Sequence, residues 1–351
     1  MHTTYEDLME QAYSLPDGRA KVEVLEEAIR VADSMGDIDL GYEARSELVE
    51  TATFHGYPMK ALVAFSWQLG QFDKDPERFD DYSLFWSYKW MLDQVPSFPD
   101  ISRTQIENLL EDMRNRYREY GYSDRTYYYY RFVLGMKYGE AKAAEPYLKK
   151  FQEMEPDDMS NCQACEQDQL VEFQTMLGNY EEALRLAKPI LKGRMTCGEV
   201  PHVTLAYLLK PLYDLGRLEE AKEYHLKGYR LIKGQRDFPE QFGQHIGYLT
   251  LVDPIRALEV FEECVGLTLN HENPHDKMIF DAYAAGLFKR LSQENVKFQV
   301  KLPVEYPHPE EATDVVRLSM RFGEMAMDTA QRLDQRNGNS YHTNRVKDII
   351  G

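Results

Sequence analysis

The stretch Gly178-Asn179-Tyr180-Glu181-Glu182-Ala183-Leu184 decides the fold, and it recurs as Gly216-Arg217-Leu218-Glu219-Glu220-Ala221-Lys222. In both copies a glycine is followed five positions later by an alanine. Glycine can adopt the left-handed backbone conformation that a tight turn between two helices requires. Alanine is small enough for two helices to cross closely. The stretch therefore predicts two antiparallel helices joined at the glycine.

Weaker copies of this spacing occur on both sides of the two full copies. They lie at Gly56–Ala61, Met136–Ala141 and Val252–Ala257. From Ala61 to Ala141 is 80 positions, and the later steps between the alanines are 42, 38 and 36. A repeat of this length is typical of helical solenoids, in which each hairpin buries its apolar faces against its neighbours.

The two full copies resemble the turn and second-helix start of tetratricopeptide repeats. The resemblance covers residues 40–265, although the spacing exceeds the family's usual period of about 34 residues. It implies an all-α fold, a right-handed α-α superhelix of about seven helical hairpins. It also implies a concave groove lined by the first helix of each hairpin. Members of this family mostly bind peptides or proteins and rarely catalyse reactions.

The repeats divide the chain into four parts. Residues 1–36 are expected to be N-terminal capping helices and residues 37–265 the repeats. Residues 266–336 should form a divergent hairpin and a capping helix. Residues 337–351 are expected to be a loose tail, because Asn-Gly-Asn-Ser at 337–340 gives no reason for a helix to continue.

The overall charge excludes one class of partner. With 41 Lys and Arg against 59 Asp and Glu, the formal charge is −18, and no basic patch stands out. Such a surface repels phosphate backbones, so no nucleic-acid partner is expected. The N-terminal sequence lacks the features of a signal peptide, and no uncharged apolar stretch could cross a membrane. The sequence therefore predicts a cytoplasmic protein with no membrane partner; it does not indicate an oligomeric state.

Three of the four cysteines and one histidine are expected to meet at one corner of a hairpin. Helices are predicted over residues 160–177 and 181–192, and antiparallel packing brings the start of the first beside the end of the second. That places Cys162 and Cys165 next to Cys197 and His202. Three thiolates and one imidazole are a ligand set for structural zinc. Buried free thiols or a reversible disulfide are the alternatives.

The segment His271-Glu272-Asn273-Pro274-His275 has the letters of a zinc-protease motif. That chemistry needs both histidines on one face of a continuous helix, and Pro274 argues against such a helix. The segment is therefore predicted to be a solvated loop between repeats.

A peptide groove can be outlined by aligning each repeat on its turn residue. In the run Tyr127–Tyr130, the side chain of Tyr130 is expected to face the groove, while Tyr128, Tyr129 and Phe132 pack between helices. The full set of expected groove residues is Glu50, Thr53, Tyr130, Asp168, Glu172, Lys210, Tyr213 and His245. Acidic and aromatic side chains of this kind suit a peptide with basic and apolar side chains.

The leading functional hypothesis is a non-catalytic scaffold that binds a peptide or partner protein, with a structural zinc ion as a possible cofactor. One alternative is a regulator that senses a peptide pheromone but lacks its own DNA-binding domain, since residues 1–36 are too short for one. Another alternative is a metal- or thiol-dependent enzyme that uses the cysteine corner or the His271 loop.

Overall fold

The computed structural model describes residues 4–294 and 296–351, which form helices and contain no strand. In the first half of the chain the helices are α1 (Tyr5–Ser14), α2 (Arg19–Met35), α3 (Ile38–Thr53), α4 (Pro58–Phe72), α5 (Asp81–Gln94), α6 (Arg103–Glu119), α7 (Arg125–Lys137), α8 (Ala141–Gln152), α9 (Gln163–Met176) and α10 (Tyr180–Leu191). In the second half they are α11 (His202–Tyr207), α12 (Leu209–Asp214), α13 (Leu218–Ile232), α14 (Pro239–Val252), α15 (Pro254–Thr268), α16 (Pro274–Ser292), α17 (Val315–Asn337) and α18 (Tyr341–Ile350). Short 3₁₀ turns lie at η1 (Pro76–Arg78), η2 (Val95–Ser97) and η3 (Pro309–Thr313).

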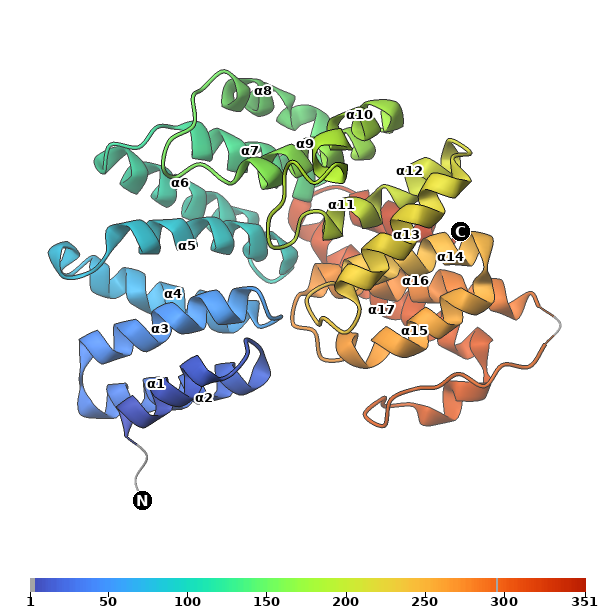
Figure 1. Cartoon of the computed structure of the whole chain (residues 1–351), viewed down its shortest axis with the longest axis horizontal. Coiled ribbons are helices and arrows are strands. Elements are labelled where there is room, and N and C mark those ends of the chain that lie inside the picture. The colour runs from blue at the N-terminus through green and yellow to red at the C-terminus, as the bar shows by residue number, and fades with distance from the viewer. Residues whose placement is uncertain (1–3, 295) are drawn as a thin grey trace.

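Consecutive helices pack as hairpins, and the hairpins stack on one another (Figure 1). The predicted turn glycines Gly56, Gly178 and Gly216 all have positive φ angles, between 71° and 77°, and in the Met136–Ala141 copy this conformation is adopted by Gly139, at 76°. The all-α hairpin solenoid predicted from the repeats is therefore confirmed. Buried apolar side chains form one large core in α1–α9 and a second in α9–α17, so each half of the chain has its own apolar centre.

Two repeats depart from the pattern for identifiable reasons. The first helix of one hairpin is split into α11 and α12 at Leu208. Pro211 lies four residues after Tyr207, and a proline there removes a helical hydrogen bond and crowds that carbonyl. In the α7–α8 hairpin Ala141 is only half-buried, and the close crossing lies one turn later. There, a Cβ on Gly135 would lie 2.6 Å from the Cβ of Ala144.

The predicted tail is wrong. After a left-handed C-cap at Gly338, the chain forms helix α18, which packs on α16 and α17 with His342 and Val346 buried. Asn-Gly-Asn-Ser is thus a turn between two helices. The following helix is only ten residues long, and a helix of that length depends on tertiary packing that local sequence does not reveal.

The C-terminal helices close the chain onto its first half. In α17, Arg336 donates hydrogen bonds to the carbonyls of Pro96 and Phe98 at 2.7 and 3.0 Å. Asn339 donates to the carbonyl of Tyr138 at 2.7 Å. Further back along the chain, Arg236 lies against the ring of Tyr57. The concave side of the solenoid is therefore bounded by both halves.

Candidate functional site

A central cavity of about 1340 Å³ lies between the two halves of the chain. Its wall includes the α3–α4 turn, the end of α5, one face each of α7 and α9, and parts of α11, α12, α14, α16 and α18. These segments come from almost the whole length of the sequence. The cavity thus depends on the stacking of the hairpins and on the contacts that bring α17 against η2 and α18 against α16.

Carboxylates outnumber basic groups in the wall of this cavity. The acidic lining residues are Asp93, Asp168, Glu172, Glu199, Asp237, Glu240, Asp276 and Asp348, and the basic ones are Lys137, Lys210, Lys289, Arg290 and Arg345. Three of these basic side chains already form ion pairs with acids: Lys210 with Asp214, Arg290 with Glu294 and Arg345 with Glu240. The uncompensated charge of the cavity is therefore negative.

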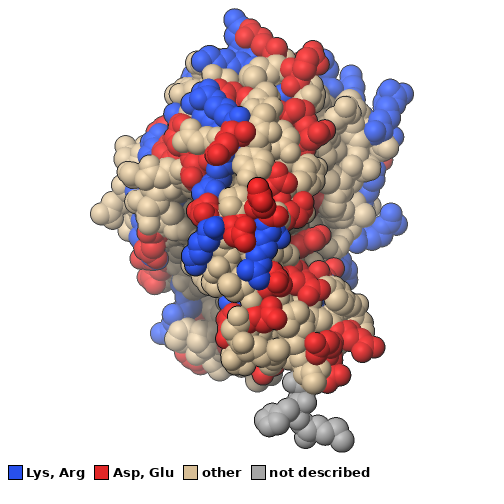
Figure 2. All heavy atoms as spheres, turned by 90° about the vertical axis from the view of Figure 1, so that its left-hand side faces the viewer, with Lys and Arg blue, Asp and Glu red and all other residues tan. Residues whose placement is uncertain are grey.

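The outer surface carries charged side chains of both signs (Figure 2). On the face shown in Figure 2, acidic and basic side chains are intermingled. Many outer charges are paired between hairpins, as Arg116 is with Asp73 at 2.6 Å and Arg78 with Asp39 at 2.7 Å. Exposed acids without an ion pair, such as Glu77 and Glu155, also lie on the outer surface, but only in the cavity do such acids surround a common hollow in the described part of the chain.

Burial raises the pKa of several cavity acids. The pKa of Asp168, which is only 4 % exposed, rises to about 7, although hydrogen bonds from the hydroxyls of Thr204 and Tyr207 act in the opposite direction. Burial also raises the pKa values of Asp93 and Asp237 to about 6. Asp93 is exposed to the solvent of the cavity, whereas Asp168 is enclosed by its neighbours.

One basic group lies among these acids. Burial lowers the pKa of Lys137, but the nearby carboxylates of Glu172, Glu240 and Asp276 outweigh burial and raise it. Lys137 therefore remains charged and offsets part of the negative potential on the α7 side of the cavity.

A cluster of histidines and carboxylates occupies the wall beside α14 and α16. His275 Nδ1 lies 3.4 Å from Asp276 and 3.6 Å from Glu240, and His271 Nε2 lies 3.8 Å from Asp276. Burial would raise the pKa of Asp276, but the neighbouring rings of His271 and His275 outweigh burial and hold it below the usual range. Because Arg345 also pairs with Glu240 at 2.7 Å, the cluster is an internal ion-pair network.

The same cluster tests the prediction for the His271 segment. His271 precedes α16 and His275 lies in its first turn, so the two do not share a continuous helix, as expected. The expectation of a solvated loop is wrong, since His271, Asn273 and His275 are all buried. Closure of the chain explains this, because Asn273 donates a hydrogen bond to Gln94 at 3.3 Å from the other half of the molecule.

Half of the predicted groove residues line the cavity: Thr53, Asp168, Glu172 and Lys210. Glu50 is exposed elsewhere, and Tyr213 packs against the second apolar core. His245 is fully buried, with its Nδ1 3.0 Å from that of His225. Tyr130 is also fully buried, with its hydroxyl bonded to the Lys89 carbonyl, and its neighbour Tyr129 lines the cavity instead.

Other lining residues were not indicated by the sequence. Asp93 and Glu199 lie at or beyond helix ends, and Arg345 lies in a helix that the sequence did not predict. Their approach to one another depends on how far the solenoid curves. Aligning the repeats on their turns predicts which side of each helix faces the groove, but it does not predict how far the solenoid curves.

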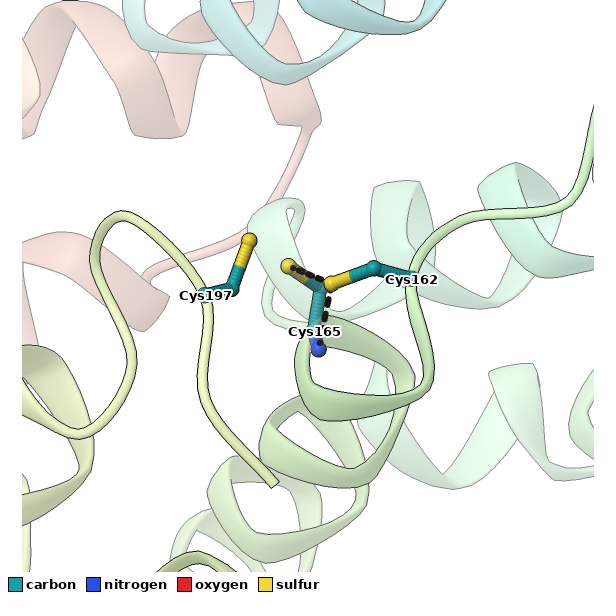
Figure 3. Close-up of side chains that lie close together, drawn as sticks. All are labelled: Cys162, Cys165 and Cys197. Carbon is teal, nitrogen blue, oxygen red and sulfur yellow. Dashed lines mark hydrogen bonds between the residues drawn. The ribbon is translucent and has the colours of Figure 1, made fainter. Parts of the chain in front are cut away.

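The predicted cysteine corner forms only in part. The sulfur atoms of Cys162, Cys165 and Cys197 lie within 4.8 Å of one another, and all three cysteines are free thiols (Figure 3). His202 does not belong to this group. Its ring stacks on Phe238 instead, with centroids 5.6 Å apart and planes 7° from parallel.

No protein-family model matches the chain, and no curated protein matches it. Among the residues that the structure describes, no helix combines the length and the apolar character needed to span a bilayer.

Proposed function

We propose that this chain is a non-catalytic scaffold of the tetratricopeptide class that binds a peptide segment of a partner protein in its central cavity. The segment carries basic side chains beside apolar ones. The observation that carries the proposal is the surplus of carboxylates in the cavity wall. Asp93, Glu172, Asp237 and Asp348 line it and form no ion pair within 4.0 Å in the described part of the chain. A ligand with positive charge would supply the missing partners.

The size of the cavity supports a peptide rather than a small metabolite. Small-molecule pockets usually measure about 300–1,000 Å³, and this cavity is larger, at about 1340 Å³. Its wall also offers aromatic rings. Phe54 and Trp90 meet edge to face at 5.2 Å, and Phe54 is 37 % exposed. An arginine or lysine of a ligand would gain cation–π stabilisation over such rings.

A reducing compartment such as the cytoplasm suits this protein. All four cysteines are free, including Cys162 and Cys165, whose sulfur atoms lie 2.8 Å apart. Disulfides persist mainly in oxidising compartments.

Selection from a random heptapeptide library displayed on phage tests the proposal directly. We expect peptides eluted from the immobilised protein to be enriched in lysine and arginine, and a synthetic copy of a selected peptide to bind more weakly as salt increases. Selected sequences without basic enrichment, or binding that does not change with salt, would contradict it.

Matched variants locate the binding surface. Glu172→Gln removes a cavity carboxylate, whereas Glu223→Gln removes an exposed one on α13 that does not line the cavity. We expect the first to weaken binding of the selected peptide by roughly fivefold or more, the usual scale for a charge contact of about 1 kcal/mol. The second should leave it unchanged. Equal effects of the two substitutions would place the peptide elsewhere.

A further inference from the structure

Three thiols from two separate segments converge at the edge of the central cavity. Cys162 is the N-cap of α9 and Cys165 lies in its first turn, whereas Cys197 lies in the loop between α10 and α11. The three side chains point toward one another (Figure 3), and Cys165 is also part of the cavity wall. Sulfur atoms that share one tetrahedral metal ion lie about 3.8 Å apart, given metal–sulfur bonds of about 2.3 Å. The observed separations are all within 4.8 Å, and that between Cys162 and Cys165 is 2.8 Å, so these two sulfur atoms would move apart by about 1 Å around a metal ion.

The segment that leads to Cys162 is held in place by buried hydrogen bonds. Lys89, which is 1 % exposed, donates to the carbonyl of Met159 at 3.1 Å. Thr126 donates to the same carbonyl at 3.0 Å. Asp157 accepts hydrogen bonds from the backbone and hydroxyl of Ser123 at 2.9 and 2.6 Å. This part of the thiol cluster is therefore positioned before any ligand arrives, as metal sites require.

The segment that carries Cys197 has much less support. Its loop rests on a small apolar cluster in which only Ala164, Ile190 and Val200 are buried, separate from both large cores. Within the loop, the Cys197 amide donates to the carbonyl of Val200 at 3.0 Å. A metal ion bound to Cys197 and to the first turn of α9 would fasten this loop, which lacks a core of its own.

We propose that Cys162, Cys165 and Cys197 bind one zinc ion as three thiolates, and that the fourth coordination position is left to a water molecule at the edge of the cavity. Soft thiolate ligands favour zinc over the harder divalent ions. His202 does not complete the set, because its ring is held against Phe238. Three protein ligands and one exchangeable position differ from the closed four-ligand sites that are typical of structural zinc. This inference does not depend on peptide binding.

Cobalt titration of the reduced protein is the test, because Co²⁺ reports thiolate ligation through its absorption spectrum. We expect one equivalent of Co²⁺ to give thiolate-to-metal charge-transfer absorption and tetrahedral d–d bands, and one equivalent of Zn²⁺ to abolish both. Reduced wild-type protein that binds neither ion would overturn the proposal.

Three variants identify the ligands, and circular dichroism of each confirms that it is folded. Cys162→Ser should weaken metal binding by more than about 100-fold, beyond the 10–100-fold that loss of an outer-shell partner costs. Cys264→Ser alters the one cysteine outside the cluster, a fully buried thiol on α15, and should leave the spectrum unchanged. His202→Ala should keep the same bands and the same affinity within threefold. A loss of affinity in His202→Ala as large as that in Cys162→Ser would overturn the three-thiolate assignment.

Discussion

At the scale of single residues, the turn glycines are the strongest link between this sequence and its fold. Each repeat needs a left-handed residue between its two helices, and Gly178 and Gly139 supply it with φ angles of 75° and 76°. The surroundings of the two glycines differ. A Cβ on Gly178 would meet nothing within 4 Å, whereas a Cβ on Gly139 would lie 2.2 Å from the ring of Tyr341.

The first prediction compares alanine substitutions at these two glycines. Gly178→Ala should lower the free energy of unfolding by about 1–2 kcal/mol, the cost of a left-handed alanine. Gly139→Ala should cost a further 1–3 kcal/mol or so, because the ring of Tyr341 must move. Urea unfolding of both variants measures the difference. Equal losses would show that α18 does not press against this turn.

The second prediction concerns the buried carboxyl of Asp168. Burial raises its pKa in the folded state from 3.8 to about 7. The folded protein therefore keeps a proton that the unfolded chain loses, and this group lowers stability as pH rises from about 4 to about 7. Asp168→Asn removes the titration. The variant should gain stability relative to wild type between pH 5 and pH 8.

Urea unfolding of wild type and Asp168→Asn at pH 5 and pH 8 checks the sign of this change in stability. Asp348→Asn is the control, because Asp348 lines the same cavity, is exposed and does not act on the pKa of Asp168. A difference between Asp168→Asn and wild type that does not change with pH would contradict the raised pKa.

The helical spacing of four leucines predicts an apolar stripe, and the structure confirms it, since all four are at most 1 % exposed: Leu205, Leu208, Leu209 and Leu212. Aligning the repeats on their turns placed Tyr130 and His245 in the groove, and this prediction is wrong, because both are core residues. Both residues lie on helices, as expected. A ring that carries a polar atom fits a core where that atom has a hydrogen-bond partner. Tyr130 has the Lys89 carbonyl and His245 has His225. Those partners come from other hairpins, so local spacing could not identify them.

At the scale of helices, α18 shows what limits prediction from sequence. Asn-Gly-Asn-Ser at 337–340 indicates that the preceding helix ends there, but nothing local indicates that another helix follows. In the structure Asp334 of α17 anchors the start of α18, because its carboxylate accepts the amides of His342 and Thr343 at 2.8 and 2.9 Å. The start of α18 is therefore stabilised by a side chain of the preceding helix, α17.

The third prediction tests this anchor. Asp334→Ala leaves two amides at the helix start without their charged acceptor, so it should cost about 2–3 kcal/mol. The control is Asp328→Ala, which removes a side chain of the same helix that is 72 % exposed and should cost less than about 0.5 kcal/mol. Amide hydrogen exchange over residues 341–350 should accelerate in the first variant only. Unchanged exchange in both variants would show that apolar packing alone holds α18.

At the scale of the whole molecule, closure of the solenoid turns the expected groove into a partly open central cavity. The repeat spacing predicted stacked hairpins, and four of the expected groove residues do line the hollow. Closure itself depends on contacts between residues more than 200 positions apart, such as that between Arg336 and Pro96. No repeat pattern carries such information, so the acidic wall contributed by both halves appears only in the structure.

The fourth prediction separates the contacts that hold the two halves together. Arg332 and Arg336 both reach from α17 to the segment at 96–100. Arg332 pairs with Asp100, whose side chain is 85 % exposed, whereas Arg336 donates to two backbone carbonyls in a partly buried position. An exposed ion pair contributes about 0–1 kcal/mol. Loss of a hydrogen bond from a charged donor costs about 1.5–3 kcal/mol, and less at Phe98, whose carbonyl also accepts the Ile101 amide at 3.2 Å.

Arg336→Ala should therefore lower the free energy of unfolding by about 2–4 kcal/mol, and Arg332→Ala by less than about 1 kcal/mol. Urea unfolding measures both values, and limited proteolysis near residues 96–100 reports whether the halves separate. If closure depends on these buried hydrogen bonds, only Arg336→Ala exposes that segment to protease. It should then also weaken binding of the selected basic peptide, because the wall that carries Asp93 moves away from the wall that carries Glu240. Equal protease resistance in the two variants would mean that apolar packing between the halves is sufficient to close the cavity.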